Sequence, residues 1–426
     1  MPRRMKDSGL QWVGKIPAEW GIAPLYSTAR QVKKLNVGNR ERNLLSLSYG
    51  RIKRKDIDMA TGLVPASYAG YNIIESGDIV LRLTDLQNDK KSIRVGLSKE
   101  RGIVTSAYVT IRPDGKVSSD YLAYSILAFD IAKGFYGIGS GVRQGLTYDE
   151  VKKLKFQFPP LPEQEAIAAF LDSVTGKIDD LRGKLKREID RLEDYKKSAI
   201  TKAVCHGLDP TAKMKDSGIP WVGKVPQGWK VSKNKFVMHK VKEICPKWGG
   251  ENVLSLSMKG VVVRDIENPS GKMPKTFDGY QYVKPGELLF CLFDLDVTPR
   301  SVGRSKVAGV TSPAYSRYVL HADVELDYIY YYYLALDDNC VLEKLGNNCR
   351  HALPDEEFRK LLIILPPLPE QREIAAHIDA MVGRVNAIVE KRKRQLDALD
   401  KLKRTVVYDY VTGKREVPLP KGGRSR

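Results

Sequence analysis

The sequence predicts an α+β fold built from two tandem copies of one unit, in which a globular segment precedes a long helix. Three observations support this prediction. The segment 5–20 recurs at 214–229, the hexapeptide Pro-Pro-Leu-Pro-Glu-Gln occurs at 159–164 and again at 366–371, and a proline-free run of about forty residues follows each hexapeptide. Because the duplication covers the whole chain, we expect two equivalent domains and two equivalent helices.

Short apolar segments bounded by turn residues recur in both copies and are typical of strands. They are 43–48 with 252–257, 77–83 with 286–292, and 104–111 with 310–317. Helical stretches then begin at Asp120 and Asp327, and strands followed by helices indicate an α+β domain. The tyrosine run 328–333 could form a platform on which bases stack or could pack in a core. Core packing is favoured, because the first copy has Tyr121 and Tyr124 at this place among Leu and Ile.

The long runs have the spacing of a helix that pairs with another helix, since apolar residues recur mostly three and four positions apart. The expected seam consists of Ile167, Leu171, Val174, Ile178, Leu181, Leu185, Ile189, Leu192 and Ala199 in the first run, and of Ile374, Ile378, Met381, Val385, Ile388, Leu396, Leu399, Leu402 and Val406 in the second. At about 1.5 Å per residue each helix is roughly 60 Å long, which predicts an antiparallel coiled coil acting as a spacer. The alternative is two amphipathic helices lying on separate cores.

The hexapeptide explains where each helix begins. Its prolines end any preceding element and stand where a missing N–H costs nothing, just before or in the first turn. Glu163 and Glu370 place negative charge near each helix N-terminus. The boundaries predict a first globular domain at 1–158, a central spacer helix at 159–205, a second globular domain at 206–365, a C-terminal spacer helix at 366–413 and a basic tail at 414–426.

Composition narrows the functional classes. Lys and Arg number 71 against 51 Asp and Glu, and the formal net charge of +20 favours a polyanion such as nucleic acid as partner. No apolar run approaches the ~20 residues that span a bilayer and no hydrophobic signal segment is seen, so we expect a soluble, cytoplasmic protein without a membrane partner. Five cysteines without Cys-x-x-Cys spacing and five scattered histidines predict neither a disulfide frame nor a metal site.

Motifs for catalysis are missing as well. The sequence has no Gly-x-x-x-x-Gly-Lys-Ser/Thr loop, no dinucleotide-binding glycine pattern after a strand, and no Asn/Asp-Pro-Pro-Tyr/Phe segment of an amino-methyltransferase. Pro113-Asp114 with Glu150 and Lys152 weakly imitates a nuclease core, but the second copy does not repeat it. We therefore expect no catalytic residues and no cofactor in this chain.

A glycine-containing loop carries an arginine in both copies, Arg143 and Arg350. Glycine allows close backbone approach, and arginine suits a phosphate oxygen. An arginine that holds the domain to the long helix is the alternative.

With this duplication, the two Pro-Leu-Pro-Glu-Gln segments and the paired Trp-x-Gly-x-Ile/Val-Pro-x-x-Trp segments at 12–20 and 221–229, the whole sequence resembles the specificity subunit of type I restriction-modification enzymes. The helix end Val411-Thr-Gly-Lys414 fits the resemblance, whereas the first helix departs from it with Val204-Cys-His-Gly-Leu208. The resemblance implies two target-recognition domains, held apart by an antiparallel helix pair, that each read one half of a bipartite site in double-stranded DNA. It also implies docking of two methyltransferase subunits, which bring S-adenosylmethionine and adenine-N6 chemistry, and of two restriction subunits, which use ATP and Mg.

Two readers of different half-sites should differ in the loops that contact bases. The copies diverge most at 51–69 against 260–278 and at 84–101 against 293–308. The basic residues there, predicted as base contacts, are Lys53, Arg54, Lys55, Lys90, Lys91 and Arg94 in the first copy and Lys259, Arg264, Arg300, Arg304 and Lys306 in the second. Arg143 and Arg350, which both copies share, are predicted to contact phosphates.

Two other classes of function are compatible with the residues. One is a coiled-coil scaffold or interaction protein with a basic surface and no sequence-specific DNA reading. The other is a nucleic-acid enzyme that acts alone. Loss of affinity in moderate salt would distinguish a DNA reader from a scaffold, and activity of the purified chain would favour the enzyme.

Overall fold

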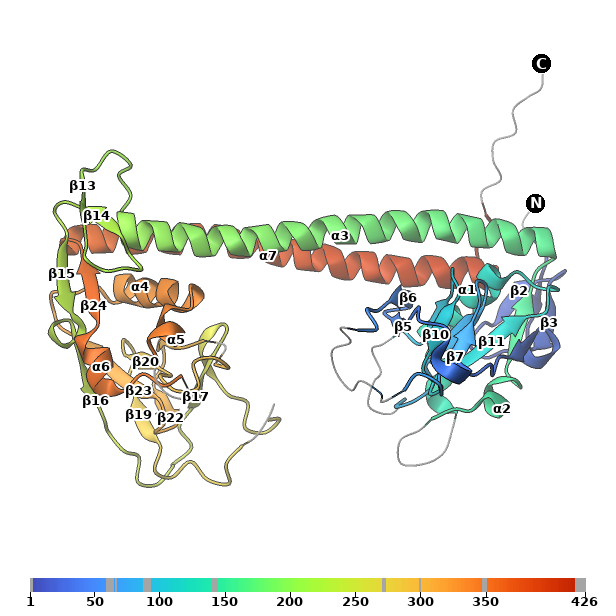
Figure 1. Cartoon of the computed structure of the whole chain (residues 1–426), viewed down its shortest axis with the longest axis horizontal. Coiled ribbons are helices and arrows are strands. Elements are labelled where there is room, and N and C mark those ends of the chain that lie inside the picture. Colours follow the sequence, from blue (N-terminus) through green and yellow to red (C-terminus); the bar gives the residue numbers. More distant parts are fainter. Residues whose placement is uncertain are drawn as a thin grey trace, which may run out of the picture. The chain divides into compact units, whose positions relative to one another are not determined.

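The chain folds into two compact units, each with a β-rich domain and parts of two long helices (Figure 1). The computed structural model describes residues 3–58, 65, 67–86, 93–138, 145–269, 273–298, 300–346 and 351–417. The first unit comprises Met1–Leu185 and Arg394–Arg426, and the second comprises Lys186–Lys393. The long helices are α3 (Leu161–His206) and α7 (Leu368–Val411). The predicted α+β fold with two β-rich domains and two paired helices is confirmed.

The first domain contains twelve named strands and two short α-helices before α3. The strands are β1 (Met5–Asp7), β2 (Lys15–Pro17), β3 (Gly21–Pro24), β4 (Ala29–Gln31), β5 (Leu45–Ser48), β6 (Arg51–Arg54), β7 (Asn72–Ile74), β8 (Ile79–Leu81), β9 (Val95–Leu97), β10 (Gly102–Val104), β11 (Val109–Pro113) and β12 (Lys155–Phe158). The helices are α1 (Ser119–Ile131) and α2 (Tyr148–Val151).

The second domain repeats this order among its described residues. Its strands are β13 (Met214–Asp216), β14 (Lys224–Pro226), β15 (Lys230–Lys233), β16 (Met238–Val241), β17 (Val253–Ser257), β18 (Gly260–Val263), β19 (Gln281–Val283), β20 (Leu288–Phe290), β21 (Val302–Arg304), β22 (Gly309–Thr311), β23 (Ser316–Leu320) and β24 (Leu362–Leu365). Its short helices are α4 (Leu326–Asp338), α5 (Val341–Leu345) and α6 (Asp355–Lys360).

Each domain is built around an antiparallel four-stranded sheet. The strand order is β4-β11-β8-β9 in the first domain and β16-β23-β20-β21 in the second, so the two sheets have the same topology. The central strand β8 is buried along its length, as is β20. The helices α1 and α4 pack in the cores, and Tyr328, Tyr331, Tyr332 and Tyr333 of α4 are buried, which confirms the prediction that the tyrosine run packs in a core.

The two hexapeptides hold the same joint in both units. The buried Trp20 indole donates to Glu163 Oε2 at 3.1 Å, and Trp229 donates to Glu370 Oε1 at 3.0 Å. Glu163 and Glu370 are predicted to complement the helix dipole, and in the structure each also accepts a hydrogen bond from a tryptophan indole. The next residue of the hexapeptide, a glutamine, joins its helix to the short helix of the domain.

That glutamine makes the same two hydrogen bonds in each copy. Gln164 accepts from the backbone N–H of Ser118, the residue that caps α1, and donates to the Pro159 carbonyl. Gln371 accepts from the backbone N–H of Glu325, which precedes α4, and donates to the Pro366 carbonyl. Since a helix N-terminus leaves backbone donors and a buried proline carbonyl needs a donor, one side chain satisfies both.

The opposite end of each long helix is also fixed by a domain. In the first unit the Tyr121 hydroxyl, buried in the core, lies within hydrogen-bond distance of the Gln157 carbonyl (3.2 Å) and of the Val411 carbonyl at the end of α7 (3.3 Å). In the second unit Tyr328 lies likewise against the Ile364 carbonyl (3.2 Å) and the Val204 carbonyl near the end of α3 (3.1 Å). The last carbonyls of a helix lack partners inside it, and these hydroxyls supply donors.

A glycine with positive φ follows each of these helix ends. Gly207 has φ 76° and Gly413 has φ 71°, the left-handed conformation that glycine adopts most readily. A Cβ at Gly413 would come within 2.4 Å of Pro17 Cδ, and one at Gly207 within 3.2 Å of Trp229 Cζ2. The chain therefore leaves both helices directly against the tryptophan of a domain.

Within each unit the two long helices run antiparallel. In the first unit Asp179 binds Lys403 (2.7 Å) and Arg182 binds Asp400 (2.7 Å). Burial alone would raise the pKa of Asp179, but the hydrogen bond and charge of Lys403, with those of Arg51, outweigh it and lower the pKa. The second unit repeats the pattern with ion pair Glu188–Arg392 at 2.8 Å.

The predicted seam is buried at the start of both helices and is wrong at three positions. Ile167, Leu171, Ile374 and Ile378 are buried. In contrast, Leu181 is 49% exposed, Ile388 is 42% exposed and Leu402 is 49% exposed. Val389 is buried next to Ile388, because a straight helix of 3.6 residues per turn drifts away from a strict seven-residue repeat. Among the residues that the structure describes, no helix is both long and apolar enough to cross a membrane.

Replacing Tyr328 by phenylalanine tests the joint at the end of α3. Removal of the hydroxyl leaves the Val204 and Ile364 carbonyls without this donor, so the free energy of unfolding of the second unit should fall by about 1–3 kcal/mol in urea denaturation. The control is Tyr330→Phe on the same helix, whose hydroxyl makes no hydrogen bond within the described residues and whose loss should cost less than about 0.5 kcal/mol. Equal losses for the two variants would contradict the role assigned to Tyr328.

Candidate nucleic-acid interface

The β5–β6 hairpin carries the exposed lysines of the first domain. Lys53 lies on β6 opposite Ser46, and Lys55 follows the strand. Both side chains are exposed, and neither makes an ion pair with another described residue. Arg54 between them is 74% exposed and donates from Nε to Glu100 Oε2 at 2.7 Å. Because an exposed ion pair is weak, Arg54 can exchange this carboxylate for a phosphate or a base.

The second domain presents lysines at two places. Lys259 lies in the turn between β17 and β18, and Lys306 lies between β21 and β22. Both are exposed and without an ion pair to the described part of the chain. Arg264 follows β18, is half-buried, and its backbone N–H donates to the Val253 carbonyl at 2.8 Å. The lysines are therefore the accessible cations of this set.

Arg94 lies in a different environment, since its side chain is fully buried. Its guanidinium donates to the carbonyls of Arg82 (3.1 Å), Thr84 (2.8 Å) and Asp85 (3.2 Å). Its backbone N–H donates to Asp130, whose pKa is raised by burial. A base contact would require all these bonds to break, so we assign Arg94 to the structural support of its loop and withdraw it as a base contact.

Arg300 has an equivalent role in the second domain. It is 8% exposed, and its guanidinium binds Asp337 (2.7 Å) and Asp338 (2.9 Å) at the end of α4. Ser301 donates its backbone N–H to Asp337, as Arg94 does to Asp130, and burial raises the pKa of Asp337 as well. Arg300 is thus also a structural residue rather than a base contact. Arginine is usually exposed, so its residue type alone gave no signal of this burial.

Arg304 is held inside the second unit. It forms ion pairs with Asp327 of α4 and, at 3.2 Å, with Asp379 of α7. Its guanidinium also lies over the rings of Tyr330 (4.9 Å) and Tyr331 (5.6 Å). Because two carboxylates and two aromatic faces already surround it, we withdraw Arg304 as a base contact too.

Four predicted residues lie outside the described residues: Lys90, Lys91, Arg143 and Arg350. The chain that follows each of the two arginines is anchored in the same way. Leu146 donates its backbone N–H to the Leu83 carbonyl at 2.9 Å, and Leu353 donates to the Leu292 carbonyl at 2.8 Å. Leu83 and Leu292 lie just before the divergent segments, so Leu146 and Leu353 lie beside the start of those segments in their domains.

The long helices carry exposed apolar side chains. Leu181, Ile388 and Leu402 belong to the predicted seam, and Tyr195 does not. Leu181 and Leu402 lie in the stretch of the first unit that the Asp179–Lys403 and Arg182–Asp400 ion pairs mark. Tyr195, 57% exposed, and Ile388 lie in the corresponding stretch of the second unit. Recurrence of an apolar residue at the same place in both copies was the available signal. Such side chains are candidates for contact with a protein partner.

The described residues contain no group of three or more His, Cys, Asp and Glu side chains placed to hold a metal ion. The candidate interface consists of the exposed lysines and Arg54, while Arg94 and Arg300 are buried and serve the structure.

Comparison with known proteins finds a family model and two relatives that resemble this chain. The family described as "Type I restriction modification DNA specificity domain" matches residues 63–191. Two proteins of Methanocaldococcus jannaschii are each 23% identical to this chain. The putative type I restriction enzyme MjaX specificity subunit aligns over 95% of this chain and 96% of its own length, and the type I restriction enzyme MjaVIII specificity subunit over 81% and 80%.

A solved structure shows the same fold. A chain from a study of the complex assembly and conformational transition of the type I R-M system superposes with a TM-score of 0.67, at 15% identity, over 94% of this chain and 99% of that chain. The HsdS subunit of Thermoanaerobacter tengcongensis aligns with a TM-score of 0.46, at 15% identity, over 96% of this chain and all of that subunit. The sequence matches agree with the fold: the chain is similar to the specificity (S) subunits of type I restriction-modification enzymes.

Proposed function

We propose that each domain reads one half of a bipartite site in double-stranded DNA. The observation that supports this is a common framework with different loops. Both domains share the sheet order, the Trp–Glu hydrogen bond and the Tyr–carbonyl joint, while their loops carry different basic residues. A framework that is kept while the loops differ suits two readers of different sequences.

The exposed cations, together with the half-buried Arg264, are the proposed DNA contacts. Lys53, Arg54 and Lys55 serve the first half-site, and Lys259, Arg264 and Lys306 serve the second, with Lys90 and Lys91 kept as proposals from the sequence. The net charge of +20 supports association with the phosphate backbone.

Arg143 and Arg350 contact phosphates, so alanine at either should weaken binding to cognate and unrelated DNA alike; a changed preferred sequence at full affinity would refute this role.

We also propose that the helices and domains dock two methyltransferase subunits and two restriction subunits. Those partners would bring S-adenosylmethionine, ATP and Mg, and this chain would contribute binding alone. The equivalent exposed pairs Leu181 with Leu402 and Tyr195 with Ile388 support two copies of one partner. The superposed chain mentioned above comes from a study of type I R-M complex assembly, which supports the same view.

Duplication of one domain tests the half-site proposal. Replacing residues 214–366 by a copy of residues 5–159 gives a chain with two first domains, and we expect it to select a site whose two halves carry the same sequence in inverted order. The measurement is selection of bound duplexes from a random DNA library in the presence of the methyltransferase. The reciprocal replacement, with two second domains, is the control and should select the other half-site twice. Selection of the original bipartite site by either chain would contradict the proposal.

Lengthening both helices tests whether they set the gap between half-sites. Seven residues inserted after Leu185 and seven after Leu396 fall between the ion pairs Arg182–Asp400 and Glu188–Arg392 and so keep the helices paired. Seven residues add about 10 Å, or about three base pairs, so the same half-sites should be selected with a longer gap.

The control for this experiment is insertion into α3 alone, which misaligns the seam and should lower stability. An insertion after Gly207 would be a poorer test, because Gly207 packs against Trp229 and Glu370. An unchanged gap in the doubly lengthened chain would show that the helices do not set it.

A further inference from the structure

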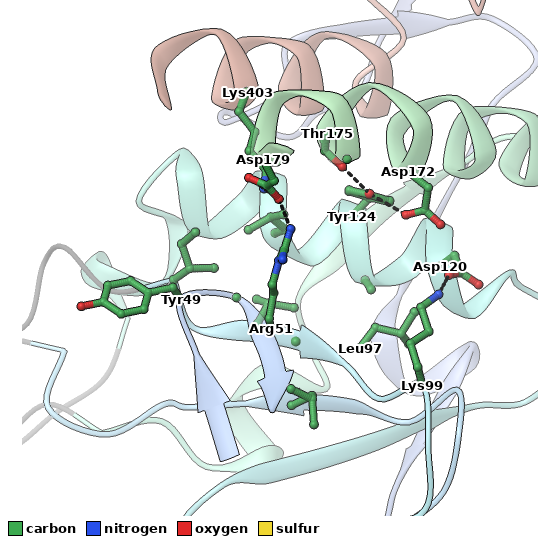
Figure 2. Close-up of a pocket in the computed structure, with 18 residues that line it drawn as sticks. Tyr49, Arg51, Leu97, Lys99, Asp120, Tyr124, Asp172, Thr175, Asp179 and Lys403 are labelled. Atoms are coloured by element: carbon green, nitrogen blue, oxygen red, sulfur yellow. Dashed lines mark hydrogen bonds and ion pairs between the residues drawn. The ribbon is translucent and has the colours of Figure 1, made fainter. Parts of the chain in front are cut away.

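The first unit contains a cavity of about 400 Å³ between the β5–β6 hairpin, strand β9, helix α1 and helix α3 (Figure 2). Ile52, Leu97 and Leu127 form an apolar part of its wall. Three carboxylates line it as well, Asp120 of α1 and Asp172 and Asp179 of α3, with the basic side chains of Arg51, Lys99 and Lys403. Arg51 and Lys403 both pair with Asp179, which leaves Asp120 and Asp172 for a ligand. An apolar wall with carboxylates suits a ligand that has an aliphatic stem and a cationic head.

The second unit holds an arginine at the equivalent place. Arg304 is the last residue of β21, as Leu97 is the last residue of β9. The carboxylates that bind Arg304 are Asp327, the second residue of α4, and Asp379 of α7. Their counterparts in the first unit are Asp120, the second residue of α1, and Asp172 of α3.

A tyrosine holds the second of these carboxylates in both units. The Tyr331 hydroxyl donates to Asp379, and the Tyr124 hydroxyl donates to Asp172 Oδ1 at 2.7 Å (Figure 2). The same constellation of two aspartates and one tyrosine therefore ligates a guanidinium in one copy and lines a cavity in the other. Two smaller residues account for the space in the first copy, Leu97 for Arg304 and Ala123 for Tyr330.

Without the arginine, a lysine occupies one carboxylate of the cavity. Lys99 binds Asp120 at 2.5 Å in the first unit, with its side chain 68% exposed. The counterpart Lys306 is exposed and has no such partner among the described residues, because Arg304 binds Asp327 instead. An exposed lysine pair contributes at most about 1 kcal/mol, so an incoming guanidinium can displace Lys99.

We propose that this cavity takes an arginine side chain of a bound protein partner, the methyltransferase subunit, with its guanidinium between Asp120 and Asp172. This proposal rests on the docking proposed above. Arginine fits better than lysine, because its planar fork reaches two carboxylates at once and its face stacks on an aromatic ring such as that of Tyr124. Since Arg304 already fills the corresponding place in the second unit, two copies of one partner would meet unlike surfaces.

The substitution Leu97→Arg tests the proposal by copying the second unit. The new guanidinium should bind Asp120 and Asp172 within the chain and exclude the partner's arginine, so one of two bound methyltransferases should bind at least tenfold more weakly. Native mass spectrometry and calorimetric titration of the chain with the methyltransferase measure this. The matched control is Arg304→Leu, the reverse change in the second unit, which should weaken neither binding event. Equal affinity of the Leu97→Arg chain and the unaltered chain for two methyltransferases would overturn the proposal.

Single-charge variants make the same comparison with less change in volume. Asp172→Asn keeps an acceptor for Tyr124 and removes the charge. It should therefore lower the affinity for one of the two methyltransferase subunits about tenfold, or about 1.4 kcal/mol. Asp379→Asn is the matched change in the second unit and should leave both methyltransferases bound. An equal effect of the two variants would contradict the asymmetry. DNA binding should be unchanged in all these chains, and melting temperatures verify that each one folds.

A small probe separates this proposal from the docking it rests on. Saturation-transfer NMR should detect weak binding of N-acetyl-L-arginine amide to the unaltered chain and none to the Leu97→Arg chain, with N-acetyl-L-norleucine amide as control. Absence of probe binding to the unaltered chain would overturn the assigned chemistry of the cavity. Probe binding together with failure of any methyltransferase to bind would overturn the docking partner while keeping the arginine chemistry.

Discussion

The fold depends on a tyrosine hydroxyl that joins the last strand of each domain to the end of a long helix. Tyr121 lies against the carbonyl of Val411, and Tyr328 lies against that of Val204. Tyr121 of the first domain holds the end of α7, which begins after the second domain. Tyr328 of the second domain holds the end of α3, which begins after the first domain. Since buried carbonyls at a helix end need a donor, each domain completes the helix that begins in the other copy. Neither copy of the duplicated unit is therefore a complete domain by itself.

The two units also share the same hydrogen bonds at the start of each long helix. The hexapeptide places a glutamate on a buried tryptophan and a glutamine on the first turn of the short helix, in both units. Helix start, helix end and domain core thus meet at one joint. The segments that differ between the copies supply none of these hydrogen-bonding residues, so they can change while the joint is kept. The proposed reading of two different half-sites on one framework requires this property.

Repetition made most of the fold predictable from the sequence. Two copies of one pattern located the helices to within a few residues and showed that a tyrosine run belongs to a core. Contacts between residues far apart in sequence gave no such signal. The partnership of Trp229 with Glu370, or of Arg94 with three loop carbonyls, exists only once the sheet has brought them together. Helical drift explains why Leu181 is exposed although the apolar spacing places it in the seam.

Removal of the C-terminal half of α7 tests the shared joint most directly. In a chain shortened to end at Lys393, the first unit loses Val407, Tyr410 and Val411 from its core, whereas the second unit keeps all its residues. Amide hydrogen exchange should then show loss of protection in α1 and β12, with α4 and β24 protected as in the full chain. Unchanged protection of α1 and β12 in the shortened chain would show that the first domain is complete without the helix end, and would contradict the account.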